Sequence, residues 1–565
     1  MAPGIALSPD ARREVESALA DWLRDDNTRR LWDSDASLWT SHGEERWLGW
    51  LRVLEGWRER VPDLERWAAD VRDVGFRHVV VLGMGGSSLC PEVIARTFGT
   101  RPGWPELRVL DSTVPDQIRG LRLALDPGRT LFVVASKSGT TIEPNAFASY
   151  FEAEVRAEIG AAGAGSHFIA ITDPGSSLDE RASGHYRDVI HGVPSIGGRF
   201  SALSPFGLVP AALAGVDLRE LLERAEKMVE ACKPEVPIEQ NPGVTLGLVL
   251  GTLALRGRDK LTLVASPPLT SLGIWLEQLI AESTGKHGRG IVPIDGERLG
   301  PVGVYGDDRL FVDLSTATDP PDSRLAQLEA AGHPVVRIPL EGTLDIAAEF
   351  FRWEVATAVA ASVLGVNPFD QPDVEAAKLA ARALMATHSE GGSLPERAAL
   401  LRQDGITLFA DAANADALAP TGDLESVLAA HLGRLDPGDY LALNAFIARN
   451  DRSHAALQTL RHCVRDARGV ATTLGYGPRF QHSTGQLHKG GPNRGVFLQI
   501  TADPEDDLEI PDQAFSFGVL ATAQSLGDFD VLAERGRRLL RVHLGTDVAG
   551  GLARLADAVE RALGE

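Results

Sequence analysis

The sequence predicts an α/β protein built on doubly wound parallel sheets, and three observations lead to this fold class. Short apolar runs recur along the chain and are typical of strands buried on both faces of a parallel sheet. Segments of helical period separate these runs, so strands and helices alternate. Clusters of glycine, serine and threonine directly follow several runs, as expected at the carboxyl ends of strands, where such sheets bind ligands.

Length, charge and cysteine content limit the number of domains and the kinds of partner. A chain of 565 residues exceeds what one core supports and predicts about three domains. A net charge of −22 argues against nucleic acid or an anionic membrane as the main partner, but not against an anionic small substrate. The widely spaced Cys90, Cys232 and Cys463 suggest neither a disulfide framework nor a zinc motif and fit a reducing cytoplasm.

No segment predicts a membrane span or a conventional signal peptide. Charged residues from Asp10 to Arg13 precede any apolar run near the start of the sequence. The longest apolar segment, residues 243–255, is bounded by Pro242 and Arg256 and is too short to cross a bilayer. It is therefore expected to be a core helix.

Residues 1–70 are predicted to form a helical extension packed on the first domain. Apolar side chains recur there at helical spacing and are expected to share one buried face. They are Trp22, Leu23, Leu31 and Trp32.

The first α/β domain is expected at residues 71–215. A strand at 78–82 runs into the glycine-rich turn GMGGSSL and a helix that opens near Pro91. Such a turn lets backbone N–H groups approach a phosphate, although this one is neither a dinucleotide fingerprint nor a Walker loop. Further strands are expected at 107–110, 131–135, 168–172 and 189–191.

The stretch TLFVVASKSGTT, residues 130–141, is the strongest anion-site candidate. A buried strand stops at a run of hydroxyls, one lysine and one glycine, and a helix follows, with Thr140 and Glu143 at capping-box spacing and Pro144 in its first turn. Hydroxyls, an ammonium group and free N–H groups at a helix N-terminus would converge on one point and bind a phosphate. An ordinary polar loop is the alternative.

The second α/β domain is expected at residues 216–385, with strands at 261–265, 291–294, 310–314 and 335–338. In the helix that begins near Ser271, Gln278 and Glu282 lie four residues apart on one face. A solvated salt bridge between Glu282 and Lys286 explains this spacing equally well. Arg199, in PSIGGRFS, reads most simply as a surface arginine in a turn.

In NPFDQPDVEAAK, residues 367–378, Gln371 and Lys378 lie two helical turns apart. Residues 386–422 resemble a linker or an irregular crossover, and residues 386–565 are predicted to form a C-terminal α/β region with strands at 440–446 and 496–501. His482 and His488 are six apart there, which does not match a helical metal pair, so no metal site is expected.

Five motifs in register, GMGGSS, SKSGTT, GGRFS, EQLIAESTGK and NPFDQPDVEAAK, resemble the phosphoglucose isomerases, which are built from two sugar-isomerase (SIS) domains. The resemblance covers roughly residues 70–380. HSTGQLHKGGPN and the stretch after it look like the isomerase half of bifunctional transaldolase/phosphoglucose isomerase proteins, without a transaldolase half.

The resemblance implies interconversion of glucose 6-phosphate and fructose 6-phosphate without a cofactor, in glycolysis and gluconeogenesis. Glu282 would move the proton between C2 and C1, Arg199 would stabilise the enediolate, and Lys378 would assist ring opening. Phosphate and sugar hydroxyls would be held by Gly85, Gly86, Ser87, Ser136, Lys137, Ser138, Thr140, Thr141, Gln278 and Gln371.

The position of the ring-opening histidine departs from the family pattern. In bacterial relatives it lies in an HSxGQ-like segment between the glutamate and the lysine, whereas here HSTGQ begins at His482, after Lys378. The role therefore goes to His482, with His488 as the substitute. Because this histidine often comes from a neighbouring subunit in the family, a homodimer is expected.

Two alternatives stay open. SIS domains also serve in sugar-phosphate sensors, although the acidic balance shows no sign of the DNA-binding face that such regulators carry. An isomerase of broader range, acting for example on mannose 6-phosphate or an amino-sugar phosphate, would show the same motifs.

Overall fold

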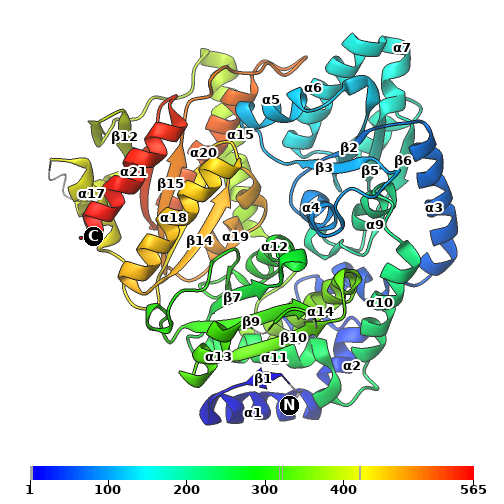
Figure 1. The fold of residues 1–565 in the computed structure, drawn as a ribbon, viewed down its shortest axis with the longest axis vertical. Coiled ribbons are helices and arrows are strands. Elements are labelled where there is room, and N and C mark those ends of the chain that lie inside the picture. Colours follow the sequence, from blue (N-terminus) through cyan, green and yellow to red (C-terminus); the bar gives the residue numbers. More distant parts are fainter. Residues whose placement is uncertain (1–3, 317, 321, 419–421, 565) are drawn as a thin grey trace.

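The computed structural model describes residues 4–316, 318–320, 322–418 and 422–564. Figure 1 shows three sheets in three lobes, the first at the upper right, the second at the bottom and the third at the left. Each sheet has a parallel core with helices on its faces, so the predicted α/β fold class is confirmed.

The first sheet is wholly parallel, with strand order β3-β2-β4-β5-β6. Its strands are β2 (His78–Gly83), β3 (Glu106–Leu110), β4 (Thr130–Ala135), β5 (Phe168–Thr172) and β6 (Asp188–His191). Its helices are α3 (Trp57–Asp73), α4 (Gly86–Phe98), α5 (Pro115–Leu123), α6 (Ile142–Ile159), α7 (Ala161–Ala164), α8 (Ser177–Ala182) and α9 (Pro205–Leu213). All five predicted strands are present.

The second sheet has strand order β1-β10-β9-β7-β8, antiparallel only at β1. Its parallel strands are β7 (Lys260–Ala265), β8 (Val292–Ile294), β9 (Arg309–Thr316) and β10 (Val335–Leu340). The helices of this part are α10 (Leu218–Ala231), α11 (Pro242–Leu255), α12 (Leu272–Thr284), α13 (Ser323–Ala330), α14 (Ile346–Leu364) and α15 (Pro372–Gly391). The apolar segment at 243–255 is α11, a buried core helix as predicted.

The third sheet has strand order β11-β12-β16-β15-β13-β14, with antiparallel pairing at β11 and β12. Its strands are β11 (Leu401–Gln403), β12 (Ile406–Phe409), β13 (Tyr440–Phe446), β14 (Ala471–Tyr476), β15 (Gly495–Thr501) and β16 (Arg538–His543). Its helices are α16 (Ala412–Leu418), α17 (Leu424–Leu432), α18 (Asp451–Arg468), α19 (Gly485–Gly490), α20 (Phe517–Glu534) and α21 (Val548–Leu563).

Three local predictions are wrong. Residues 386–422 are not merely a linker, because they contain β11, β12 and α16; residues 419–421 lie outside the described part. Helix α4 begins at Gly86, so Pro91 lies inside it. Helix α6 is capped at Thr141 without a side-chain cap bond, and Glu143 points into the interior instead of forming a capping box with Thr140.

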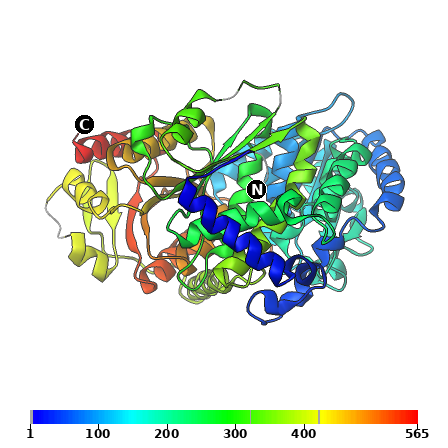
Figure 2. The same ribbon diagram turned by 90° about the horizontal axis from the view of Figure 1, so that it is seen from below.

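The N-terminal segment bridges two lobes rather than packing on the first alone. Strand β1 (Ile5–Ala6) pairs with β10 of the second sheet, and α1 (Pro9–Arg24) packs along α11, as Figure 2 shows. Helix α2 (Asn27–Trp32) follows it. The predicted apolar face is correct except at Leu23, which is 63% exposed.

One continuous hydrophobic cluster joins the first two lobes. It runs from the N-terminal helices through one face of the first sheet to α11, α12 and α14. The other face of the first sheet packs with Phe517 and Leu520 of α20, so the third lobe is anchored as well. The site described next lies where the three lobes meet. The domain boundaries at residues 70, 215 and 385 stay a prediction.

Candidate active site

A cavity of about 440 Å³ opens where the carboxyl ends of β2 and β4 face α12 and the 3₁₀ turn Arg479–His482. All three lobes contribute to its wall. Most of the predicted site residues line it: Gly85, Gly86, Ser87, Ser136, Lys137, Ser138, Thr141, Arg199, Gln278, Glu282, Gln371, Lys378 and His482. Residues that are up to about 400 positions apart in the sequence therefore share one site.

The polar loop after β4 forms one end of this cavity. Ser136 is buried, and its hydroxyl has no hydrogen-bond partner among the described residues. The Lys137 ammonium donates to the Asp173 carboxylate and to Pro194 O at 3.1 Å. An unsatisfied buried hydroxyl beside a held ammonium group suits an anionic ligand that would complete both.

The glycines after β2 allow a close crossing of two loops. Gly85 has φ +55°, a left-handed conformation that favours glycine. A Cβ at Gly86 would collide with the carbonyl oxygen of Gly198, which directly precedes Arg199 in the other loop. The absence of side chains here thus lets the arginine-bearing loop reach the cavity.

Glu282 and Arg199 form the chemical centre of the cavity. The Glu282 carboxylate lies 3.4 Å from the Arg199 guanidinium, and both side chains are less than a tenth exposed. Gln278, one helical turn before Glu282 on α12, donates to its other carboxylate oxygen at 3.0 Å and to His482 O at 2.7 Å. The predicted common face of these two residues is confirmed, whereas the Glu282–Lys286 salt bridge is not formed.

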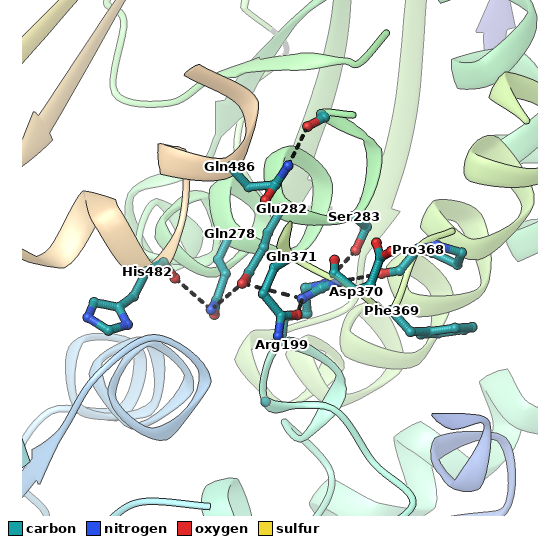
Figure 3. A network of polar contacts seen from close by, with 12 residues as sticks. Arg199, Gln278, Glu282, Ser283, Pro368, Phe369, Asp370, Gln371, His482 and Gln486 are labelled. Atoms are coloured by element: carbon teal, nitrogen blue, oxygen red, sulfur yellow. Dashed lines mark hydrogen bonds and ion pairs between the residues drawn. The ribbon is translucent and has the colours of Figure 1, made fainter. Parts of the chain in front are cut away.

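Arg199 is held in one orientation by four further hydrogen bonds, shown in Figure 3. Its guanidinium donates to Ser283 Oγ at 2.9 Å and to Gln371 Oε1 at 3.0 Å. Two more bonds go to the carbonyls of Pro368 and Asp370 at 2.6 and 2.9 Å. The simple interpretation of Arg199 as a surface arginine is wrong.

Burial lowers the pKa of Arg199, while Glu282 and Asp370 counteract the effect, and an arginine stays protonated under such conditions. The buried Lys286 pairs at 2.9 Å with the carboxylate of Asp370, the residue whose carbonyl accepts from Arg199. Burial, reinforced by Arg199, lowers the pKa of Lys286 to about 7. Lys286 therefore supports the loop that holds Arg199 and does not pair with Glu282.

His482 is oriented by a buried carboxylate. Its Nε2 lies 2.9 Å from Glu143 Oε1, the same oxygen that accepts from Gln524 Nε2 at 2.7 Å. Gln524 in turn accepts from the Thr113 hydroxyl at 2.7 Å. Burial raises the pKa of Glu143, but attraction and hydrogen bonding to His482 outweigh it, so the pKa lies below its ordinary value. A charged carboxylate thus faces the imidazole.

Lys378 is the most accessible cationic group of the site. Its side chain is 35% exposed, and its ammonium donates to Glu375 Oε1 at 3.0 Å. It lines the cavity together with His482.

Two predicted residues are not brought to this cavity. Thr140 bonds to Ser138 Oγ at 2.9 Å and lines a neighbouring cavity. His488 is buried among Tyr440, Phe480 and Phe497, and neither ring nitrogen has a partner among the described residues. Burial, with Lys489 and Arg537, lowers the pKa of His488 well below its ordinary value. It is a neutral core residue that does not line the cavity, so the structure does not place it where a substitute for His482 would have to lie.

Three residues of the site were not predicted. Glu143 matched a capping box, which hid its role as the partner of His482. Asp173 follows β5 at the same sheet edge as the polar loop after β4, a position that could have indicated it. Trp47, whose ring lies 5.9 Å from the Lys137 ammonium, comes from the N-terminal segment and had no sequence signal.

Two features are absent from the described ranges. No group of three or more His, Cys, Asp or Glu side chains there is arranged to hold a metal ion. No helix there has both the length and the apolar character of a membrane span.

Comparison with known proteins identifies the relatives of this chain. Residues 66–298 match the family model of phosphoglucose isomerase. The glucose-6-phosphate isomerase of Rubrobacter xylanophilus is 32% identical over 364 residues, which make up 55% of this chain and 83% of that protein. The enzyme of the same name from Thermus thermophilus is 29% identical over 392 residues, 60% of this chain and 90% of that protein.

Among solved structures, a hypothetical protein from Thermus thermophilus aligns with a TM-score of 0.58 and 26% identity. The alignment covers 68% of this chain and 100% of that one. Together with the motifs that meet in the cavity, these similarities show that the chain belongs to the phosphoglucose isomerase family.

Proposed function

We propose that the protein interconverts glucose 6-phosphate and fructose 6-phosphate through an enediolate, in glycolysis and gluconeogenesis. The observation that carries the proposal is the buried Glu282–Arg199 pair in a cavity that is also lined by the hydroxyl-rich loop after β4. The names of the relatives support the same reaction.

The phosphoryl group would occupy the end formed by Ser87, Ser136, Ser138 and Thr141, near Lys137. Ser136 offers a free hydroxyl, and Lys137 offers charge that Asp173 now balances. The sugar chain would then extend toward Glu282, with Gln278 and Gln371 beside its hydroxyls. Binding of a remote phosphate in this way fixes the position of the reacting carbons.

His482 would open the sugar ring by moving a proton between the ring oxygen and the hydroxyl at C1 of glucose 6-phosphate or C2 of fructose 6-phosphate. Its contact with the charged Glu143 stabilises an imidazolium and fixes the ring orientation. Lys378, which lines the same cavity, would stabilise negative charge on the ring oxygen as the bond breaks.

The Glu282 carboxylate would then take the proton from C2 of the open aldose. As C2 loses its proton, the electron pair forms the C1–C2 double bond and the carbonyl oxygen gains negative charge beside Arg199. The C2 hydroxyl proton then passes to the negatively charged oxygen at C1, and Glu282 returns its proton to C1 as the electron pair on the C2 oxygen forms the ketose carbonyl. The product therefore carries a hydroxyl at C1 and a carbonyl at C2, and the Glu282 carboxylate is regenerated. One carboxylate suffices because C1 and C2 are neighbours and both can face it.

The test is a coupled assay of glucose 6-phosphate formation from fructose 6-phosphate with EDTA present. Glu282→Gln should lower kcat by about 10³-fold or more, within the range for loss of a positioned acid–base group. Glu277→Gln is the matched control, because Glu277 lies on the same helix but lines a different cavity. Near-normal turnover of the Glu282→Gln protein would refute the mechanism.

The two alternative functions, a sugar-phosphate sensor and an isomerase of broader substrate range, explain these observations less well. A sugar-phosphate sensor needs no buried carboxylate facing an arginine at the reacting carbons, and it would bind without turnover. Activity on mannose 6-phosphate or an amino-sugar phosphate would be an extension of the same chemistry, which a substrate panel would reveal. We place the enzyme in the cytoplasm on the basis of this metabolic role.

A homodimer is proposed from the family resemblance alone. The site does not need a second chain for its histidine, because His482 of the same chain lines the cavity with Glu282. Whether a second chain also contributes to the site stays a prediction, which the mixed-chain experiment below tests.

A further inference from the structure

The three sheets share one order of parallel strands. In each, the first parallel strand of the chain lies between the second and the third, as β2 lies between β3 and β4, β7 between β8 and β9, and β13 between β14 and β15. The second parallel strand pairs with one edge of the first strand, and the third parallel strand pairs with its opposite edge, so the strand order reverses at the first strand. Sheets of this kind bind ligands at the carboxyl ends of the strands that flank such a reversal.

In the first sheet these strands are β2 and β4, and the loops after them form the proposed phosphate end of the isomerase cavity. The corresponding loops of the third sheet follow β13 and β15. Residues 446–448, 450 and 501–504, at the ends of these strands and in the loops after them, line a separate cavity of about 640 Å³, which also touches the carboxyl end of β16. Its size is that of a small-molecule site.

The inner wall of this second cavity carries a buried cation, Arg541 on β16, which is 6% exposed. Its Nε donates to Gln499 Oε1 and its Nη2 to Ser525 O, both at 2.7 Å. Within the described part of the chain, no carboxylate lies within 4.0 Å of the guanidinium. Burial, reinforced by nearby Arg397, lowers the pKa of Arg541 to about 9, although the more distant Asp528 and Asp530 partly counteract the effect.

The other charged groups that line the cavity are exposed or paired with a group of opposite charge. Arg397 and Arg541 lie over the ring of Phe529, at 5.3 and 4.9 Å from its centroid, and Arg397 is paired with Asp530 at 2.5 Å, which leaves Arg541 as the buried cation without an ion pair to a described residue. His543 bonds to Thr501 Oγ1 at 3.1 Å and to Asp503 at 3.2 Å. The acidic lining residues Asp503 and Glu396 are exposed, and the third, Asp116, is paired with Arg119 at 3.0 Å. Arg541 is therefore the source of positive charge on the inner wall.

Apolar side chains complete the inner wall, chiefly Phe446, Ile447 and Leu526. A bare ion would leave most of this volume and apolar surface unfilled. A molecule with an anionic group and an organic body would satisfy both, and a guanidinium with neighbouring hydroxyls suits the several oxygens of a phosphoryl group. We propose that the third sheet holds a second ligand site, which binds a small organic phosphate with its phosphoryl group against Arg541.

Helix α20 separates this site from the isomerase cavity. Thr522 and Ser525 line the second cavity, whereas Gln524 donates to Glu143, the partner of His482. A substitution that displaces α20 would disturb Glu143 and lower the isomerase activity. Retained activity therefore reports an intact helix in any variant of the second site.

The test uses phenyl phosphate as the probe, with binding followed by ligand-observed NMR on the full chain. Ser138→Glu places a negative charge in the isomerase cavity and removes that site from the measurement. In this background, Ala521→Phe fills the second cavity without removing a hydrogen bond, and Arg541→Met removes its cation. Ala157→Phe, at an exposed position of α6, is the matched control for the added ring.

We expect the Ser138→Glu protein to bind phenyl phosphate with a Kd below about 10 mM, a range typical of a weak probe. Ala521→Phe and Arg541→Met should each weaken binding at least about tenfold, which corresponds to loss of a charged hydrogen bond or of the space itself. Ala157→Phe should leave it unchanged. If Arg541→Met fails to fold, Ala521→Phe decides alone, since its isomerase activity in the otherwise native chain shows that it is folded.

Absence of binding to the Ser138→Glu protein, or binding that neither cavity variant weakens, would overturn the second site. Neither result bears on the isomerase proposal, which depends on turnover and on Glu282. Conversely, loss of isomerase activity in Glu282→Gln leaves the second site untouched.

Discussion

Replacing Glu143 by glutamine removes one negative charge beside His482 while keeping the size and the accepting oxygen of the side chain. The Glu143 side chain is 5% exposed and that of His482 is 12% exposed, so solvent screens their contact little. A hydrogen bond to a charged group contributes about 1.5–3 kcal/mol. We expect the carboxylate to give this stabilisation to the protonated His482 during ring opening. Its loss in the Glu143→Gln protein should then lower kcat about 10- to 160-fold.

The coupled assay should show this loss in kcat with little change in KM, because Glu143 does not line the cavity that holds the sugar. Glu158→Gln, at the exposed end of α6, is the control and should be neutral. A double-mutant cycle with His482→Asn gives the decisive result. If Glu143 acts through His482, the second substitution should add little to the first. Full additivity, or activity of Glu143→Gln within about twofold of the native value, would refute the reasoning.

Three other predictions test the structure around the site. The folded-state pKa of Glu143 is lowered, so its contribution to stability is complete above the unfolded value of about 4.3 and is lost as pH falls through the folded value; urea unfolding of the native and Glu143→Gln proteins should therefore differ less at low pH, and a gap that widens there would contradict the assignment. Gly86→Ala should lower the free energy of unfolding by about 1–3 kcal/mol and reduce activity, because its Cβ would strike Gly198 O. Gly197→Ala, where no described atom lies within 4 Å of the new Cβ, should do neither in the same unfolding and activity assays. Mixed Glu282→Gln and His482→Asn chains, refolded together, should regain no activity, since both residues belong to one chain's site; recovery of about a quarter of the native activity would show a site shared between subunits of a dimer.

The sequence was sufficient where the signal is local. The apolar run at β4 and the hydroxyls that follow it lie within a dozen residues, so period and composition alone predicted a strand, a polar loop and a helix start. The same holds for Gln278 and Glu282, because a spacing of four on a helix places two side chains on one face whatever surrounds them.

Predictions from local sequence patterns failed where a segment distant in the sequence provides the partner of a residue. Glu143 has the spacing of a capping residue, but burial beside His482, which is 339 positions away, gives it a different partner. Residues 401–409 are short and polar enough to read as a linker, yet they form strands because β16 offers β12 an edge to pair with. A strand of three or four residues is too short to show the alternation of apolar and polar side chains by which strands are predicted, so the pairing of β12 with β16 could not be read from the sequence.

The sequence by itself therefore determined the fold class, the polar loop after β4 and the face of α12 that carries Glu282, since each depends on neighbours within one or two turns. Only the tertiary structure decided that Arg199 is buried and that His482, rather than His488, reaches the cavity. The physical reason is the same in both cases. Whether a polar side chain is satisfied in the interior, exposed or aimed at a ligand depends on groups that other lobes bring to it, and those distances are not encoded in local spacing.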